Sequence, residues 1–110
     1  MSKLFKLRAD QITQIIPPMG GCFATDKITV QGELVVFMCR EEIEFESDRG
    51  WRFFSGTEDQ NYVDDSHNTM IYDVNTIANY DKAIIPYLNL PVGTELERVR
   101  GTDDFNIIVQ

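Results

Sequence analysis

Histidine and cysteine, the side chains that most often serve as catalytic bases, nucleophiles and zinc ligands, are scarce in this sequence. His67 is the only histidine, and Cys22 and Cys39 are the only cysteines. A catalytic triad needs a base beside a serine or cysteine, and a zinc site needs about four ligands that usually arrive in close pairs. These scattered positions favour neither, so we predict no enzyme activity, no metal and no cofactor. We interpret His67 as a solvated loop residue and the cysteines as reduced, buried thiols.

Long apolar runs are also missing. The longest run, Leu34 to Cys39, falls far short of the roughly 20 residues that a membrane-spanning helix requires. The first residues, Met1 to Leu7, lack the apolar stretch and the cleavage site of a secretion signal. We therefore expect a cytoplasmic protein with no membrane partner.

Cationic side chains are few relative to acidic ones. The chain has 10 Lys and Arg against 18 Asp and Glu, for a formal net charge of −8. Nucleic acids and anionic lipids are bound largely through cations, so we expect neither as a partner. A basic protein would be attracted instead, although the same charge also serves solubility.

The length of 110 residues predicts a single domain over residues 1–110, and the apolar patterning predicts the α+β class. We expect a mainly antiparallel sheet with two or three short helices. Helices are predicted over 8–16, over 75–80, and after Asp81 as the capping residue. Strands are predicted over 22–25, 26–30, 34–40, 50–56, 70–74, 94–100 and 105–109. We expect the second and third strands to form a hairpin around Gly32, and the last two strands to form another.

The stretch Gly50-Trp51-Arg52-Phe53-Phe54-Ser55-Gly56 is the strongest strand signal. Alternation places Trp51 and Phe53 on one face and Arg52 and Phe54 on the other. A lone tryptophan can be a core residue or an exposed binding anchor, and the area it would bury favours the core.

Two connecting segments are rich in acid. Glu41 to Arg49 is predicted to be a solvated loop, because its carboxylates repel one another. Thr57 to Thr69 is predicted to be an ordered, acidic loop. The second loop lacks the central glycine and final glutamate of an EF-hand, and nothing marks any of its carboxylate pairs as catalytic. Its Tyr62 combines apolar area with a hydroxyl, which suits an exposed contact.

Several short stretches together form a family pattern. They are Cys22-Phe23-Ala24-Thr25-Asp26, the Gly50 to Gly56 stretch with Glu58-Asp59, Tyr62 with Asp64 and Asn68, Ile71-Tyr72-Asp73 with Asn75-Thr76, Asp81 with Ile84-Ile85-Pro86, and Gly93 with Glu97-Arg98. On these residues, over about 21–98, the chain resembles a bacterial domain-of-unknown-function family that overlaps the immunity proteins of polymorphic toxin systems (family 2185, immunity type thirty-three). The resemblance implies a cytosolic α+β protein with no known reaction, some of whose relatives neutralise a toxin by binding it. Met1 to Gly20 and Phe105 to Gln110 lie outside the pattern.

Three hypotheses follow. The first is a non-enzymatic binding protein, an immunity protein that contacts a basic protein toxin through the acidic loop. Its expected partner-binding residues are Trp51, Arg52, Glu58, Asp59, Tyr62, Asp64 and Asp65, with the first two supporting the loop from beneath. The second is a small-ligand-binding protein or an enzyme that uses the carboxylates near Trp51. The third is an oligomeric module in which the strand 105–109 pairs with a second copy; we expect a monomer or a weak homo-oligomer.

Overall fold

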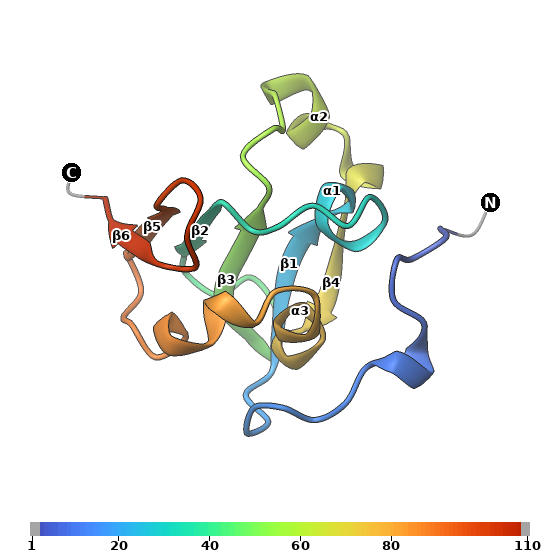
Figure 1. The fold of residues 1–110 in the computed structure, drawn as a ribbon, viewed down its shortest axis with the longest axis horizontal. Helices are drawn as coiled ribbons and strands as arrows, with labels where there is room; N and C mark the ends of the chain where they lie inside the picture. The colour runs from blue at the N-terminus through green and yellow to red at the C-terminus, as the bar shows by residue number, and fades with distance from the viewer. Residues whose placement is uncertain (1–2, 109–110) are drawn as a thin grey trace.

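The computed structural model describes residues 3–108, which fold around one mixed sheet (Figure 1). Its strands are β1 (Gly21–Thr25), β2 (Phe37–Arg40), β3 (Asp48–Phe54), β4 (Thr69–Asp73), β5 (Glu95–Arg98) and β6 (Phe105–Ile107). They lie in the order β4-β1-β3-β2-β5-β6. The pair β1 and β3 is parallel, and the other four neighbouring pairs are antiparallel. The predicted α+β class with a mainly antiparallel sheet is confirmed.

Short helices connect these strands. They are α1 (Asp26–Thr29), α2 (Gln60–Asp64) and α3 (Val74–Tyr80), with 3-10 turns η1 (Ala9–Gln11), η2 (Ser66–Asn68) and η3 (Lys82–Tyr87). Aspartate carboxylates cap four of them by accepting a backbone N–H from the first turn, at Asp59, Asp65, Asp73 and Asp81. The predicted Asp81 cap is confirmed, and the segment after it is a 3-10 turn containing Pro86.

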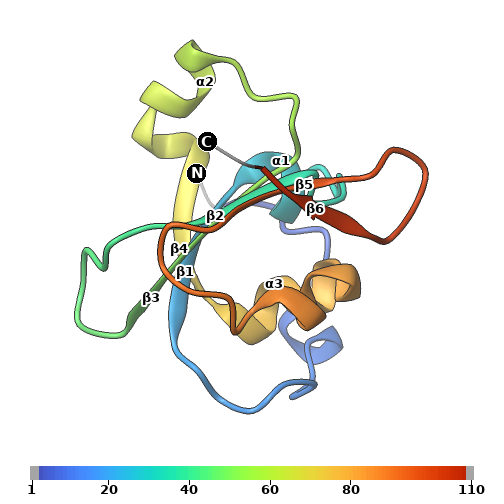
Figure 2. The ribbon, with the colours of Figure 1, turned by 90° about the vertical axis from the view of Figure 1, so that its left-hand side faces the viewer.

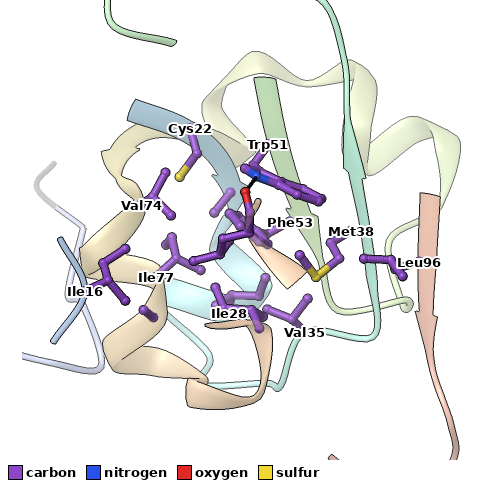
Figure 3. Packing of buried hydrophobic residues seen from close by; sticks show 14 of the residues in the cluster. Ile16, Cys22, Ile28, Val35, Met38, Trp51, Phe53, Val74, Ile77 and Leu96 are labelled. Atoms are coloured by element: carbon purple, nitrogen blue, oxygen red, sulfur yellow. Dashed lines mark hydrogen bonds between the residues drawn. The ribbon is translucent and has the colours of Figure 1, made fainter. Parts of the chain in front are cut away.

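The hydrophobic core lies on one face of the sheet (Figure 3). Alternate strand residues point into it, and α3 covers them with Val74 and Ile77. Trp51 has no exposed surface, stacks beside Phe53 with ring centroids 6.1 Å apart, and donates its indole N–H to the Leu88 carbonyl at 3.0 Å. The expectation that Trp51 is a core residue is confirmed.

The predicted helix over 8–16 is wrong, because Ile12 to Ile16 is irregular and only the single turn η1 is helical. Two amide side chains of α3 form hydrogen bonds with the backbone of this segment. Asn75 Oδ1 accepts from Ile15 N at 2.9 Å, and its Nδ2 donates to Thr13 O at 2.9 Å; Asn79 also contacts Thr13. Partners distant in the chain therefore satisfy groups that a helix would have paired locally.

The predicted hairpin over 26–40 is also wrong. Residues 26–29 form α1, and β2 pairs with β3 and β5 instead. The helical turn buries Ile28 completely and brings the Thr29 hydroxyl within 3.0 Å of the Tyr72 hydroxyl, so tertiary packing decides its structure. Strand β2 lies between β3 and β5, away from both edges of the sheet.

The expected hairpin at the end of the chain is present as β5 and β6, although each strand is shorter than predicted. The last predicted strand residue, Val109, lies outside the described residues. The acidic segment 57–69 is ordered as expected, but it contains α2 and η2 and is not a plain loop.

The two faces of the sheet differ in their cover. Viewed nearly edge-on, α3 lies on one side, whereas α2 and the loop between β2 and β3 project on the other (Figure 2). We call this second side the open face. Because β1 and β3 alternate, Phe23, Arg52 and Phe54 belong to it, and each phenylalanine is partly exposed.

Candidate functional site

An ion pair between Asp48 and Arg52 lies on β3 at the open face. Two residues four apart in a regular strand are separated by roughly 13 Å. Here β3 bulges against β1, because Gly21 pairs with Asp48 while Phe23 pairs with Arg52. The Arg52 guanidinium consequently binds both Asp48 oxygens, with Nη1 to Oδ1 at 2.9 Å and Nη2 to Oδ2 at 2.7 Å.

Gly50 makes this bulge possible. Its φ of +87° is a conformation that L side chains rarely adopt, and a Cβ there would lie 2.2 Å from the Glu41 carbonyl oxygen. The glycine N–H also donates to Asp48 Oδ1 at 2.8 Å. The first residue of the Gly-Trp-Arg motif therefore shapes the site that the third residue occupies.

Asp48 is buried, and its ionisation depends on these contacts. Burial alone would raise the pKa of the carboxyl, but hydrogen bonds from Arg52 and from the backbone N–H groups of Gly50 and Glu44, together with the arginine charge, lower the pKa to about 2. The pKa of Arg52 is raised: burial would lower it, and bonding to Asp48 outweighs that effect. The prediction that Asp48 belongs to a solvated loop is wrong, because the repulsion argument omitted this cation.

Two exposed glutamates complete the shell around Arg52. Glu44 Oε2 lies 3.1 Å from Nη2, and Glu41 Oε1 lies 3.4 Å from Nε; their side chains are 65% and 60% exposed. The Phe23 ring stacks on the guanidinium, with Cζ 4.6 Å from the ring centroid. Among the described residues, Arg52 Nε has no hydrogen-bond acceptor although it is buried.

Two adjoining hollows lie along the open face. The first has a volume of about 290 Å³, and its walls include Phe23, Glu44, Arg52, Val63 and Ser66. The second has a volume of about 520 Å³, and its walls include Phe37, Cys39, Arg40, Glu42 and Glu95. Both hollows share Glu41 and Phe54, so they form one trough across β1, β3, β2 and β5. We call this feature the sheet trough.

The segment Glu58 to Asn68, which contains α2 and η2, borders the sheet trough through Val63 and Ser66 and carries five of the seven predicted contact residues. Glu58 stands at its base and serves the fold. Its carboxylate accepts from the Thr25 hydroxyl and from the backbone N–H groups of Ser55 and Gly56. Burial raises the pKa of Glu58, and these hydrogen bonds lower it by more, so the net direction is downward.

The other predicted acids are exposed. Asp59 and Asp65 cap α2 and η2, and Asp64 accepts from the Gln60 side chain at 2.8 Å. Tyr62 is half-buried, with the Lys27 ammonium 5.2 Å from its ring centroid. These four residues therefore lie on the segment that also contributes Val63 and Ser66 to the first hollow, but they do not line that hollow themselves.

The two residues predicted to support this segment from beneath, Trp51 and Arg52, lie on opposite faces of the sheet. Arg52 lines the first hollow, as Val63 and Ser66 do, whereas Trp51 points into the core on the opposite face. Sequence reasoning missed Glu41, Glu44 and Asp48 as site residues. The glycine before the tryptophan was the available signal, because a glycine within a strand often marks a bulge.

The scarce reactive side chains are dispersed. Cys22 and Cys39 are free thiols. Burial is the largest cause that raises the pKa of each thiol, and the pKa of Cys39 rises to about 12. The His67 side chain is 92% exposed and pairs with Asp65 at 3.0 Å. Within residues 3–108, no group of three or more His, Cys, Asp or Glu side chains is arranged to hold a metal ion.

Fold and site together define a small α+β domain with an acidic, aromatic-floored surface. A family model described as the Immunity protein Imm33 domain matches residues 22–109, and the chain belongs to this family. The match confirms the resemblance noted in the sequence and extends it through β6. No curated protein and no solved structure matches the chain. Across the described part of the chain, no helix has the length and apolarity to cross a membrane.

Proposed function

We propose that this protein is an immunity protein that neutralises a basic toxin by direct, non-enzymatic contact through its acidic surface. The observation that carries the proposal is the gathering of carboxylates at one face of a chain that belongs to the Imm33 family. An immunity domain implies a toxin partner, and a net charge of −8 would attract a basic one.

Within that surface, the proposed contacts are those of the α2 and η2 segment. Asp59, Asp64 and Asp65 present exposed carboxylates, and Tyr62 adds a partly exposed ring. Glu58 would act indirectly, because it fixes the base of the segment. Arg52 would act from the wall of the first hollow, and Trp51 through the position of β3.

The test is a mass-detected pull-down from the native cell extract, at low and at physiological salt. Wild-type protein is compared with a variant carrying Asp59→Asn, Tyr62→Ala and Asp64→Asn; asparagine keeps the α2 cap while removing charge. We expect the wild-type protein to recover one stoichiometric basic partner. The variant should bind this partner at least about tenfold more weakly, because close charge pairs across interfaces couple strongly.

The matched control is Asp10→Asn with Asp104→Asn, which removes exposed carboxylates outside the α2 and η2 segment. Recovery of no partner at either salt concentration would count against an immunity role. If the control variant loses the partner equally, the loss results from overall charge and not from the α2 and η2 segment. A partner retained by the triple variant would move the contact away from α2 and η2.

A small-ligand-binding role is the second candidate, because the first hollow adjoins the buried Arg52. The glutamates around it are mostly exposed and spread along a trough, an arrangement that favours a macromolecular surface over an enclosed substrate pocket. Native mass spectrometry of the freshly purified protein would separate the two: a retained small molecule supports this candidate, and a bare mass argues against it.

A further inference from the structure

We propose that the sheet trough is the receptor for an arginine-bearing segment of the partner protein. This inference rests on the proposed function and assigns a specific surface and side-chain chemistry to it. The occupant is a stretch of the toxin whose guanidinium groups lie on the phenylalanine floor between the glutamates.

Charge complementarity is the first argument. Four glutamates line the trough, at positions 41, 42, 44 and 95, and its two lining arginines are already engaged. Arg52 is bound by both oxygens of Asp48. Arg40 donates to the carbonyl oxygens of Leu90 at 2.7 Å and Arg49 at 2.8 Å. The free trough is thus strongly negative, and an incoming cation relieves repulsion among its carboxylates.

The floor supplies the second argument. Phe23, Phe37 and Phe54 are each partly exposed on the open face, and the rings of Phe37 and Phe54 lie 5.9 Å apart. Arg52 already shows how this floor holds a guanidinium, since it stacks on Phe23 while carboxylates grip its edge. A planar guanidinium can stack on an aromatic ring and also bind both oxygens of a carboxylate, whereas a lysine ammonium offers only a point charge.

An unpaired donor is the third, independent argument. Arg52 is 4% exposed and forms part of the wall of the first hollow, yet its Nε lacks an acceptor among the described residues. Buried donors normally have partners, and an unpaired one is costly. A peptide segment brings backbone carbonyl oxygens together with its arginines. A carbonyl oxygen of the segment can therefore accept a hydrogen bond from Arg52 Nε. Alternatively, the segment can push the exposed Glu41 carboxylate, now 3.4 Å from Nε, into hydrogen-bonding position.

The presence of two adjoining hollows favours an extended segment over a single side chain as the occupant. The two hollows meet at Phe54 and Glu41, and their volumes are about 290 and 520 Å³. Each hollow has its own glutamates, Glu44 in the first and Glu42 with Glu95 in the second. Two arginines of one segment would therefore occupy adjoining hollows.

The experiment titrates the isotopically labelled full chain with acetyl-Gly-Arg-Gly-Arg-Gly-amide and follows backbone amide shifts. We expect saturable shifts centred on Phe23, Phe54 and Glu41, and none with a matched peptide in which citrulline keeps the side-chain shape without its charge. Glu41→Gln with Glu44→Gln should weaken binding at least about tenfold. Phe54→Leu should weaken it about threefold, through loss of a stacking ring.

The control variant Asp10→Asn with Asp104→Asn removes the same number of exposed charges outside the trough and should bind like wild type. Thermal melting confirms that each variant is folded. Absence of saturable shifts in the trough, equal binding by the Glu41 and Glu44 variant, or equal weakening by the control would each overturn the inference.

The same variants are then measured against the partner recovered by pull-down, which separates the two proposals. A partner that binds the Glu41 and Glu44 variant as tightly as wild type leaves the immunity role intact and overturns the trough as its receptor. Peptide binding in the trough without any recovered partner has the opposite meaning: the trough binds arginine, and the immunity role fails.

Discussion

Two buried arginines on opposite faces of the same sheet show how similar chemistry can serve two purposes. Arg52 pairs with Asp48 and stacks on Phe23, while Arg98 pairs with Asp81 and stacks on Phe105. Their side chains are 5% and 6% exposed. The surroundings differ, and that difference separates a structural tie from a candidate binding site.

Arg98 has an acceptor for every nitrogen. Its Nε donates to Val35 O at 2.8 Å, Nη1 donates to Thr102 O at 2.9 Å, and Nη2 binds Asp81. Asp81 in turn accepts from Val35 N at 3.0 Å and caps η3. This cluster joins β5, η3 and the entry to β2, and we interpret it as structural.

Arg52 has more carboxylate neighbours than its single charge requires, and its hydrogen bonding is nevertheless incomplete. Three carboxylates surround it, two of them exposed, and one of its nitrogens still lacks an acceptor among residues 3–108. Each arginine lines a hollow: Arg52 lines the first hollow of the sheet trough, and Arg98 lines one of about 340 Å³ beside Leu34 and Asp103. The two arginines differ in that Arg52 has two exposed carboxylates beside it and a nitrogen without an acceptor, and a binding surface can use both.

The largest expected effect is at the structural tie. Asp81→Ala should lower the free energy of unfolding by about 3 to 5 kcal/mol, because it leaves Arg98 buried without its anion and removes the η3 cap. Urea unfolding would measure it. Asp103→Ala, which removes only the exposed partner of Arg98, should cost less than about 1 kcal/mol. Equal losses in the two variants would contradict the comparison.

A smaller loss is expected on the open face. Asp48→Ala should cost about 2 to 3 kcal/mol, because Glu41 and Glu44 remain close enough to compensate part of the Arg52 charge. Combining the change with Glu41→Gln and Glu44→Gln should remove that compensation and cost more than the sum of the separate changes. Strict additivity in urea unfolding would show that the exposed glutamates do not share Arg52 with Asp48.

The next effect concerns the acid dependence of stability at Asp48. The pKa of Asp48 in the fold is about 2, below its ordinary 3.8, so the unfolded chain takes up the proton first. Its contribution, about 2 kcal/mol, is complete above the ordinary pKa and is lost as the pH falls toward 2. Asp48→Asn should therefore flatten the stability profile between pH 4 and pH 2, relative to wild type. An unchanged slope in that range would argue against a depressed pKa.

The smallest effect is expected from the exposed glutamates alone. Glu41→Gln with Glu44→Gln should change the free energy of unfolding by less than about 0.5 kcal/mol, because Asp48 keeps its bidentate contact with Arg52. A substantial loss in thermal or urea unfolding would place these residues in the fold and not in the proposed binding surface.

The sequence predicted the elements whose signals are local. Alternation in Gly50 to Phe54 gave both the strand and its two faces, and Asp81 marked the start of η3. It failed where distant side chains decide the backbone, as Asn75 and Asn79 do for Ile12 to Ile16. For the site, counting acids predicted attraction of a basic partner. It could not predict that a bulge at Gly50 would set Asp48 against Arg52, since that depends on pairing with β1.

The parallel pairing of β1 with β3 also bears on how the chain is made. Strand β1 finds its neighbours only in β3 and β4, which follow it after α1 and β2. Pairings between distant segments form late, because the intervening chain must be ordered before the contacts stabilise it. A nascent chain that ends before β3 has no sheet for β1 to join, and the tie at Arg98 arrives later still. For a protein proposed to neutralise a toxin, protection would begin only after β5 has been synthesised.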